Sequence, residues 1–453
     1  MDRQNYFSSS SKPELSAIET LYDKKQSAQG RQQTDRTTAS LHSKKQTVCK
    51  DTPPIIYWQN CQAEQIILNL RIHGKYVKPH TSFQHDMGRE LNDLLRCLFF
   101  RAQTILVEPL SCGFSNTRVV KVHPFYAEGG VGRVVVVKFG DAQIIEQEYE
   151  CYQNYVQYFV GDGRSTAILD HQYTSHMGGI IYSFLGTETQ QLQSFGAFYQ
   201  QASIEAIKQT LDWLFRSTCR IWYANHSSLQ FLNLTEEYQK QSSYSFNQLR
   251  HFIGKRFPEI VNQEKLTFQF FPSERTYTFL NPFHTLKTLQ PQIYSTYQCI
   301  THGDFNPGNI FVDQAGHPWL IDFQSTGPSH ILRDVATLDA VIRLQLLTSK
   351  QATLDECLAL EEALCSITNF HQLATLKKSY STANPALTKT WETLVHLRTI
   401  AHWLIEKKPS HDTREYYAAL FYVTMNTLSF SSLEEMQCEH ALISASLLTD
   451  MLR

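Results

Sequence analysis

Three side chains that could support phosphate chemistry lie within residues 300–323: Asp304, Asn309 and Asp322. Buried carboxylates are costly unless something pairs with them, and a divalent metal carrying a phosphate chain is one such partner. The pattern NIFVD, QAG, HPWLID predicts a hairpin that brings Asn309 and Asp322 to one end. Amide and carboxylate oxygens suit Mg²⁺. Asp304, on the loop before the hairpin, could then accept the proton of a substrate hydroxyl, as phosphoryl transfer requires.

Composition and charge narrow the class of protein. The chain has 453 residues and a net charge of −2. This balanced charge argues against a protein that coats nucleic acid or an anionic membrane, although it does not exclude a local basic groove. Its ten cysteines are scattered, with no C-x-x-C pair and no zinc-like cluster with histidine. The first residues lack the apolar core of a secretory signal, and no window resembles a membrane span. We therefore expect a cytoplasmic protein with reduced thiols and no nucleic-acid or membrane partner.

The sequence divides into four segments. Residues 1–52 are rich in Ser, Gln, Thr and Lys, and this composition favours a disordered polar tail over a nucleic-acid arm. Residues 53–100 contain leucines at helical spacing and predict a helical extension packed on the domain that follows, or else a small separate module. Residues 101–186 and 187–453 are the remaining two segments, and their hydrophobic periods differ.

The third segment predicts a sheet and the fourth predicts helices. TILVEPL, TRVVKV, RVVVVKFG and GGIIYSF have the apolar runs and alternation of strands, and DAQIIEQEYECYQNYVQYF has one apolar helical face. We expect a small, mostly antiparallel sheet with one helix. After residue 186 helical patterns dominate, beginning with SIEAIKQTLDWLFRSTCRIW, for which Ser203 is the predicted N-cap.

The motif HGDFNPGN followed by IDF resembles the catalytic core of aminoglycoside phosphotransferases and related small-molecule kinases, which carry H-G-D-x-x-x-x-N and then I-D-F or I-D-W. The longer stretch PWLIDFQSTGPSHILRDVATLD is similar to a bacterial phosphotransferase-like subgroup named ternary-complex-associated domains. The resemblance spans residues 101–430. It implies an α+β, two-lobed protein-kinase-like fold, with a small antiparallel N-terminal lobe and a larger, mainly helical C-terminal lobe that carries the catalytic hairpin.

The resemblance also implies a role for each residue of the motif. Asp304 would be the catalytic base, and Asn309 and Asp322 would bind Mg²⁺. His302 would hold the loop, and Asp334 would order the backbone around the site.

In the N-terminal lobe, Lys138 ends an apolar strand and would be an odd core residue without an anionic partner. The resemblance places this lysine on the α- and β-phosphates of ATP, with an ion-pair partner on the next helix. Glu148 aligns best, while Glu146 and Glu150 stay open as alternatives.

The predicted phosphate loop, LSCGFSNTRV, contains a single glycine, Gly113. Backbone N–H groups of residues 113–116 and the hydroxyl of Ser115 could contact phosphate, and the alternative is a plain turn between two strands. The strand end at residues 185–186 would be the hinge that binds adenine through backbone groups.

Together these features predict an ATP- and Mg²⁺-dependent phosphotransferase that moves the γ-phosphate to a hydroxyl of a small-molecule acceptor. The alternative is a nucleotide-binding regulatory or scaffold module, like a pseudokinase, in a multi-component complex. A metal-dependent hydrolase would need more histidine or carboxylate ligands near Asp304 than the sequence offers. GTP in place of ATP stays open, and no dense acidic cluster indicates a polycationic acceptor.

Overall fold

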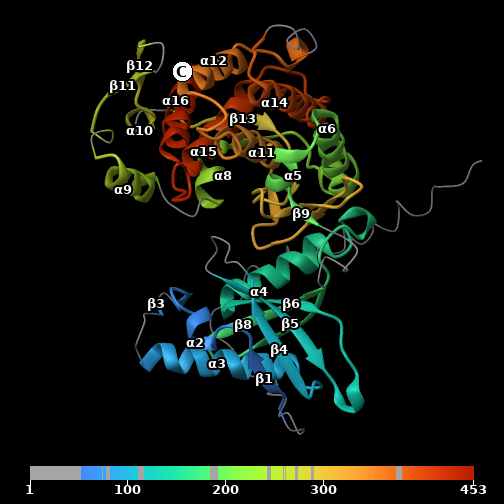
Figure 1. Ribbon diagram of the computed structural model, residues 1–453. Coiled ribbons are helices and arrows are strands. Elements are labelled where there is room, and N and C mark those ends of the chain that lie inside the picture. Colours follow the sequence, from blue (N-terminus) through green and yellow to red (C-terminus); the bar gives the residue numbers. More distant parts are fainter. Residues whose placement is uncertain are drawn as a thin grey trace, which may run out of the picture. The chain divides into compact units, whose positions relative to one another are not determined.

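The computed structural model describes residues 53–452, except residues 74, 78–81, 111–116, 184–191, 242–245, 259, 261, 271–273, 287–289 and 374–379. The predicted tail at residues 1–52 lies outside the described residues. The described part has two lobes, which Figure 1 shows: an N-lobe of residues 53–183, built around a sheet, and a C-lobe of residues 192–452, built mainly from helices. The α+β, two-lobed architecture expected from the sequence is confirmed.

A six-stranded sheet of order β1-β4-β5-β6-β8-β7 forms the centre of the N-lobe. Its strands are β1 (Ile55–Trp58), β4 (Thr104–Pro109), β5 (Arg118–Phe125), β6 (Val135–Asp141), β7 (Ile168–Tyr173) and β8 (Met177–Ser183). Neighbouring strands are antiparallel except β1 and β4, which run parallel. The sheet is therefore mixed at one edge.

Residues 53–100 are not only the helical extension that their spacing predicts. They contain α2 (Ala63–Ile66), a small ladder of β2 (Arg71–Ile72) and β3 (Lys75–Tyr76), α3 (Ser82–Leu98) and the edge strand β1. The sequence IIYW of β1 is β-branched and aromatic, which suits a strand, but four residues are too few to show a period.

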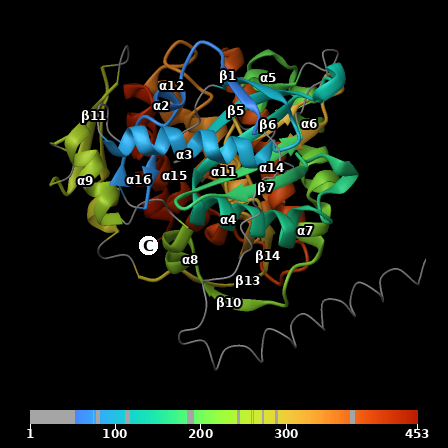
Figure 2. The same ribbon diagram turned by 90° about the horizontal axis from the view of Figure 1, so that it is seen from below.

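Two helices cover opposite faces of the sheet. Because strand side chains alternate, Val137, Phe139 and Ile181 pack in one cluster with the leucines of α3, while the residues between them face α4 (Ala142–Cys151). Figure 2 shows α3 crossing the strands. Lys138 lies between Val137 and Phe139 and therefore points to the α4 face. This alternation decides where the lysine can find a partner.

Adjacent glycines in β8 let both helices approach the sheet closely. A Cβ at Gly178 would lie 2.8 Å from Ile145 of α4, and a Cβ at Gly179 would lie 3.1 Å from Leu94 and Leu98 of α3. Glycine normally weakens a strand interior, but here it marks the close approach of a neighbouring element on each face.

The helices of the C-lobe surround one large apolar core. They are α5 (Phe195–Gln201), α6 (Ile204–Trp213), α7 (Arg220–Ala224), α8 (Leu234–Gln241), α9 (Phe246–Arg256), α10 (Pro282–Thr285), α11 (Arg333–Leu344), α12 (Leu354–Cys365), α14 (Pro385–Leu404), α15 (Arg414–Thr427) and α16 (Glu435–Leu452). The side chain of Ser203 accepts a hydrogen bond from Ala206 N and caps α6, as predicted. None of the helices in the described ranges has the length and apolar composition needed to cross a membrane.

Short strands complete the C-lobe. They are β9 (Gln193–Ser194), β10 (Gln230–Asn233), β11 (Lys265–Gln269), β12 (Thr276–Leu280), β13 (Ile293–Thr296), β14 (Gln298–Thr301), β15 (Ile310–Val312), β16 (Pro318–Leu320) and β17 (Gly327–His330). β15 and β16 form the predicted hairpin, with Ile310 opposite Leu320, and β9 pairs with the other edge of β15. None of the eight cysteines in the described part of the chain forms a disulfide bond.

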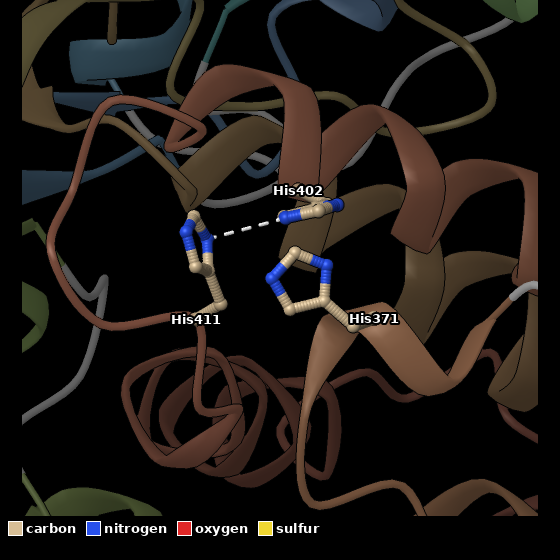
Figure 3. Close-up of side chains that lie close together, drawn as sticks. All are labelled: His371, His402 and His411. Atoms are coloured by element: carbon tan, nitrogen blue, oxygen red, sulfur yellow. Dashed lines mark hydrogen bonds between the residues drawn. The ribbon is translucent and has the colours of Figure 1, made fainter.

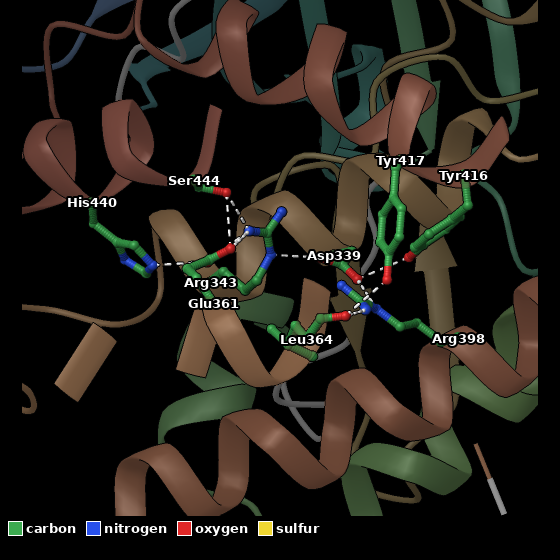
Figure 4. Close-up of polar contacts among 9 residues, drawn as sticks. All are labelled: Asp339, Arg343, Glu361, Leu364, Arg398, Tyr416, Tyr417, His440 and Ser444. Carbon is green, nitrogen blue, oxygen red and sulfur yellow. Dashed lines mark hydrogen bonds and ion pairs between the residues drawn. The ribbon is translucent and has the colours of Figure 1, made fainter. Parts of the chain in front are cut away.

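A buried polar network joins α11, α12, α14, α15 and α16 (Figure 4). Asp339 accepts hydrogen bonds from Arg343 Nε at 2.5 Å, Arg398 Nε at 3.1 Å and the Tyr416 hydroxyl at 2.8 Å. Arg343 Nη1 also lies 2.7 Å from both carboxylate oxygens of Glu361. All five side chains are at most 2% exposed, so their charges are compensated within the core instead of by solvent.

Candidate active site

Lys138 connects the two lobes through its ammonium group. Its Nζ lies 2.7 Å from Glu148 Oε2 and 2.8 Å from Asp322 Oδ1. Lys138 is 5% exposed and Glu148 is fully buried, so this pair is shielded from water on the α4 face of the sheet. The ammonium group of Lys138 in β6 thus contacts one carboxylate from α4 of the N-lobe and one from a loop of the C-lobe.

Of the three candidate glutamates on α4, the structure pairs Glu148 with Lys138. Ile145 and Glu148, three residues apart, form the buried face of the helix, whereas Glu146 and Glu150 are exposed. The hydroxyl of Tyr182 in β8 donates a 2.5 Å hydrogen bond to Glu148 Oε1. Tyr182 was not singled out from the sequence, because its alternating position in GGIIYSF reads only as a strand residue.

The charges of this cluster influence one another's protonation. Burial alone would lower the pKa of Lys138, but the carboxylates of Glu148 and Asp322 outweigh burial and hold that pKa above its ordinary value. Burial raises the pKa of Glu148, and the lysine opposes this rise. Lys138 therefore carries a firmly held positive charge at neutral pH.

Asp304 and Asn309 are linked by direct hydrogen bonds within the loop of residues 302–309, which the sequence predicts to be the catalytic loop. Asn309 Nδ2 donates to the main-chain oxygen of Asp304 at 2.9 Å and to its Oδ2 at 3.0 Å. Asn306 Nδ2 donates to the other carboxylate oxygen, Oδ1. Asn306 is a further positioning residue that the sequence pattern did not single out, since the motif tolerates any residue there.

The pKa values of the two aspartates shift in opposite directions. Burial, followed by the nearby charge of Asp322, raises the pKa of Asp304 above its ordinary value. Burial would also raise the pKa of Asp322, but the charge and hydrogen bond of Lys138 outweigh it and lower that pKa. Such a separation gives one carboxylate a stronger tendency to take up a proton and keeps the other ionised.

Asn309 and Asp322 suit the ligation of a hard divalent cation. Because the amide nitrogen of Asn309 is committed to Asp304, its Oδ1 is the atom left to bind a ligand, and no hydrogen bond from the described residues engages it. Asp322 is ionised and has a left-handed backbone conformation with φ of 65°. Backbone conformations of this kind are concentrated at functional sites. The donor set, one amide oxygen and one carboxylate, is typical of Mg²⁺ held together with phosphate.

Side chains of α11 hold the backbone of the catalytic loop by hydrogen bonds. Asp334 Oδ2 accepts from His302 N at 2.8 Å, and Asp334 Oδ1 accepts from Gly303 N at 2.9 Å. Arg333 Nη2 donates to the oxygen of Gly303 at 3.1 Å, and His302 Nε2 lies 3.0 Å from the oxygen of Ile321. The expected structural roles of His302 and Asp334 are therefore confirmed.

At Gly303 the backbone conformation of the loop and the lack of space both disfavour any residue with a side chain. Its φ is +82°, and a Cβ there would overlap the carbonyl oxygen of Ser325. We expect Gly303→Ala to lower the free energy of unfolding by at least about 2 kcal/mol, measured by urea denaturation. Gly308→Ala is the matched control, because nothing lies within 4 Å of a Cβ at that position. Equal free energies of unfolding for the two variants would contradict the predicted clash between a Cβ at residue 303 and Ser325.

A cavity opens beside Asp304 on the C-lobe side. Gly303, Asn306 and Arg333 line it from the catalytic loop and α11, and Tyr238, Tyr422 and Asn426 line it from α8 and α15. Arg333 is 8% exposed, and its Nη1 is buried without a hydrogen-bond partner among the described residues. Asp304 and Arg333 therefore both belong to the lining that a ligand in this cavity would meet.

The model of the family called ternary complex associated domain 9 matches residues 102–245 and 271–429, more than half of the chain. The chain belongs to this family. The membership confirms the resemblance drawn from PWLIDFQSTGPSHILRDVATLD. The two matched stretches contain Lys138 and Glu148 in the first, and Asp304, Asn309 and Asp322 in the second.

Several solved structures resemble this member of the ternary complex associated domain 9 family. Aminoglycoside phosphotransferase APH(4)-Ia is 10% identical, with 81% of this chain and 98% of that chain covered and a TM-score of 0.38. An aminoglycoside-3'-phosphotransferase of type VIII is 12% identical, with coverages of 75% and 98% and a TM-score of 0.39. An ethanolamine kinase of Plasmodium vivax is 12% identical, with coverages of 76% and 81% and a TM-score of 0.34. Comparison with curated proteins gives no match.

Part of the predicted nucleotide site lies outside the described residues. This applies to Gly113 and Ser115 of the phosphate loop and to the predicted hinge at residues 185–186. The roles assigned to them from the sequence stay predictions. Within the described ranges, the structure brings together Lys138, Glu148, Asp304, Asn309 and Asp322.

Proposed function

We propose that the protein is an ATP- and Mg²⁺-dependent phosphotransferase that moves the γ-phosphate to a hydroxyl of a small-molecule acceptor, in the cytoplasm. The observation that carries this proposal is the buried Lys138–Glu148 ion pair, joined through Lys138 to Asp322. Phosphoryl transfer is catalysed mainly by positioning and by charge neutralisation, and a lysine–glutamate pair with an adjacent metal-binding aspartate provides both.

Each residue has a distinct task in this proposal. Lys138 would bind phosphate oxygens of ATP, and Glu148 would hold the lysine in place. Asn309 and Asp322 would hold Mg²⁺, which supplies charge neutralisation on the transferred group. Asp304 would accept the proton of the acceptor hydroxyl on a carboxylate oxygen, with Asn306 and Asn309 fixing its orientation by hydrogen bonds.

The acceptor in this proposal is a neutral or anionic hydroxyl compound, not a polycation. Among the described residues that line the cavity, Asp304 is the only carboxylate and Arg333 the only basic group. The guanidinium group of Arg333 in this lining favours an acceptor that brings a carboxylate, phosphate or other hydrogen-bond acceptor. A polycation would bring its charge close to that guanidinium without a surrounding cluster of acidic groups.

Thermal unfolding with and without Mg²⁺-ATP tests the nucleotide site. A ligand that binds only the folded protein stabilises it by about 2.7 kcal/mol at one hundred times its Kd, so we expect a rise in Tm for the wild type. Asp322→Asn should lose most of this rise, and so should the wild type in EDTA. The exposed Asp86→Asn on α3 is the matched control and should behave as wild type. A wild-type Tm that does not move would contradict the proposal.

ADP formation with a panel of acceptors then separates the enzyme from the competing regulatory or scaffold module, which could act through protein partners in a multi-component complex. We expect turnover with at least one anionic or neutral polyol or hydroxy acid and none with a cationic aminoglycoside. A protein that gains stability from Mg²⁺-ATP yet forms no ADP, even with water as acceptor, would support the module instead.

A further inference from the structure

Three histidines of the C-lobe meet at a place remote in sequence from the catalytic motif. His371 belongs to the short 3-10 helix η5 (Phe370–Gln372), His402 to the last turn of α14, and His411 to the segment between α14 and α15. Figure 3 shows their rings turned toward one another. One ring nitrogen from each can be chosen so that all three atoms lie within 4.8 Å of one another.

We propose that these three histidines form a binding site for a divalent transition-metal ion of the zinc class. Zinc bound to histidine has Zn–N distances of 2.0–2.1 Å and tetrahedral angles, which place two ligand nitrogens about 3.4 Å apart. His402 Nε2 and His411 Nδ1 are already 3.2 Å apart. His371 completes the set by a small side-chain rotation, because its ring centre lies 4.6 Å from that of His411 and 5.0 Å from that of His402.

The scaffold holds these rings in place independently of a metal. Phe370 N donates to the main-chain oxygen of His411 at 3.0 Å, and Asn369 and Asp412 form an isolated antiparallel bridge. The ring of His402 stacks on Phe370 with a centroid distance of 5.5 Å and an interplanar angle of 5°. Ligands that are fixed before binding give a higher affinity, since less side-chain entropy is lost.

The exposure of the cluster leaves one coordination position open. His371 is exposed, and His402 and His411 are half-buried, so solvent reaches the ion from the side of His371. Three protein ligands with one free position are typical of sites in which zinc also binds water or an exogenous ligand. An aromatic cluster held by one His402–His411 hydrogen bond is the competing description of the same geometry. That description does not require a ring nitrogen of His371 to lie within 4.8 Å of ring nitrogens of both other histidines.

Metal titration of the full-length protein tests this site. Protein stripped with EDTA and then dialysed free of it should bind one equivalent of Zn²⁺ per chain in calorimetry, and Co²⁺ should give the visible absorption of a tetrahedral ion. His371→Gln, in which an exposed side chain is changed, should weaken Zn²⁺ binding by about 100-fold or more without changing the metal-free Tm. His402→Gln should weaken binding equally.

His85→Gln, an exposed histidine on α3, is the matched control and should bind as wild type. Absence of Zn²⁺ binding by the wild type, or unchanged affinity in His371→Gln, would overturn the proposal. Mg²⁺-ATP stabilisation should be the same in His371→Gln and wild type. The proposed metal site and the proposed nucleotide site are therefore tested by separate measurements, and either proposal can be contradicted without the other.

Discussion

Asp304→Asn is expected to lower the rate of ADP formation by about 10²–10⁴-fold while Mg²⁺-ATP still stabilises the fold. The substitution keeps the size of the side chain and one oxygen that can accept a hydrogen bond from Asn306 or Asn309, but it removes the carboxylate that accepts the proton. The raised pKa of Asp304 supports this role, since burial and the charge of Asp322 both favour proton uptake. The measurement is a coupled assay of ADP, with the acceptor identified from the panel or with water.

Two comparisons make this result specific to proton transfer. Asp322→Asn should lower stabilisation by Mg²⁺-ATP as well as turnover, because it removes the negative charge that would bind Mg²⁺ and one of the two carboxylate partners of Lys138. Asp86→Asn should leave both quantities unchanged, since this residue is exposed on α3. If Asp304→Asn retained wild-type turnover, the base would have to be another group and the proposed mechanism would be wrong.

Asp339→Ala is expected to cause the largest loss of stability, about 3–5 kcal/mol in the free energy of unfolding. The substitution leaves the guanidinium groups of Arg343 and Arg398 in the core without their shared carboxylate and removes the acceptor of the Tyr416 hydroxyl (Figure 4). Urea denaturation followed by circular dichroism measures the change. Activity at low temperature should fall only in proportion to the folded fraction, because Asp339 lies outside the cluster of site residues.

Two milder substitutions keep this prediction testable if Asp339→Ala does not fold. Tyr416→Phe removes only one hydroxyl from Asp339 and should cost about 1 kcal/mol, whereas Asp86→Ala at an exposed site should stay within about 0.5 kcal/mol of wild type. A loss below about 1 kcal/mol in Asp339→Ala would mean that solvent reaches this network. The charges would then not depend on one another as the structure indicates.

Much of the site could be predicted because its residues are adjacent in sequence. HGDFNPGN contains Asp304 and Asn309, and the hydrogen bonds between them join residues only five positions apart. The left-handed conformation of Gly303 is likewise a local requirement that one residue type meets without strain. Lys138 could also be singled out locally, because it ends an apolar strand and would need an anionic partner there.

Contacts between distant segments could not be predicted in the same way. Three glutamates of α4 were candidates for Lys138, and only the rotation of the helix on the sheet decided for Glu148. The strand β1 joins the sheet through pairing with β4, which no period within four residues can reveal. The network around Asp339 and the meeting of His371, His402 and His411 both depend on how separate helices pack.

The sequence by itself therefore determined the strands of the N-lobe, the helices of the C-lobe and the catalytic loop, because periods and short motifs are set by interactions between near neighbours. The two-lobed fold and the family were implied by the resemblance of its motifs to those of known phosphotransferases. The tertiary structure decided which carboxylate pairs with Lys138, which charges share the core and which histidines converge. Such contacts join residues far apart in the chain, and their geometry follows from the packing of whole elements. The spacing of apolar residues within one helix or strand does not reveal how that element packs against the others.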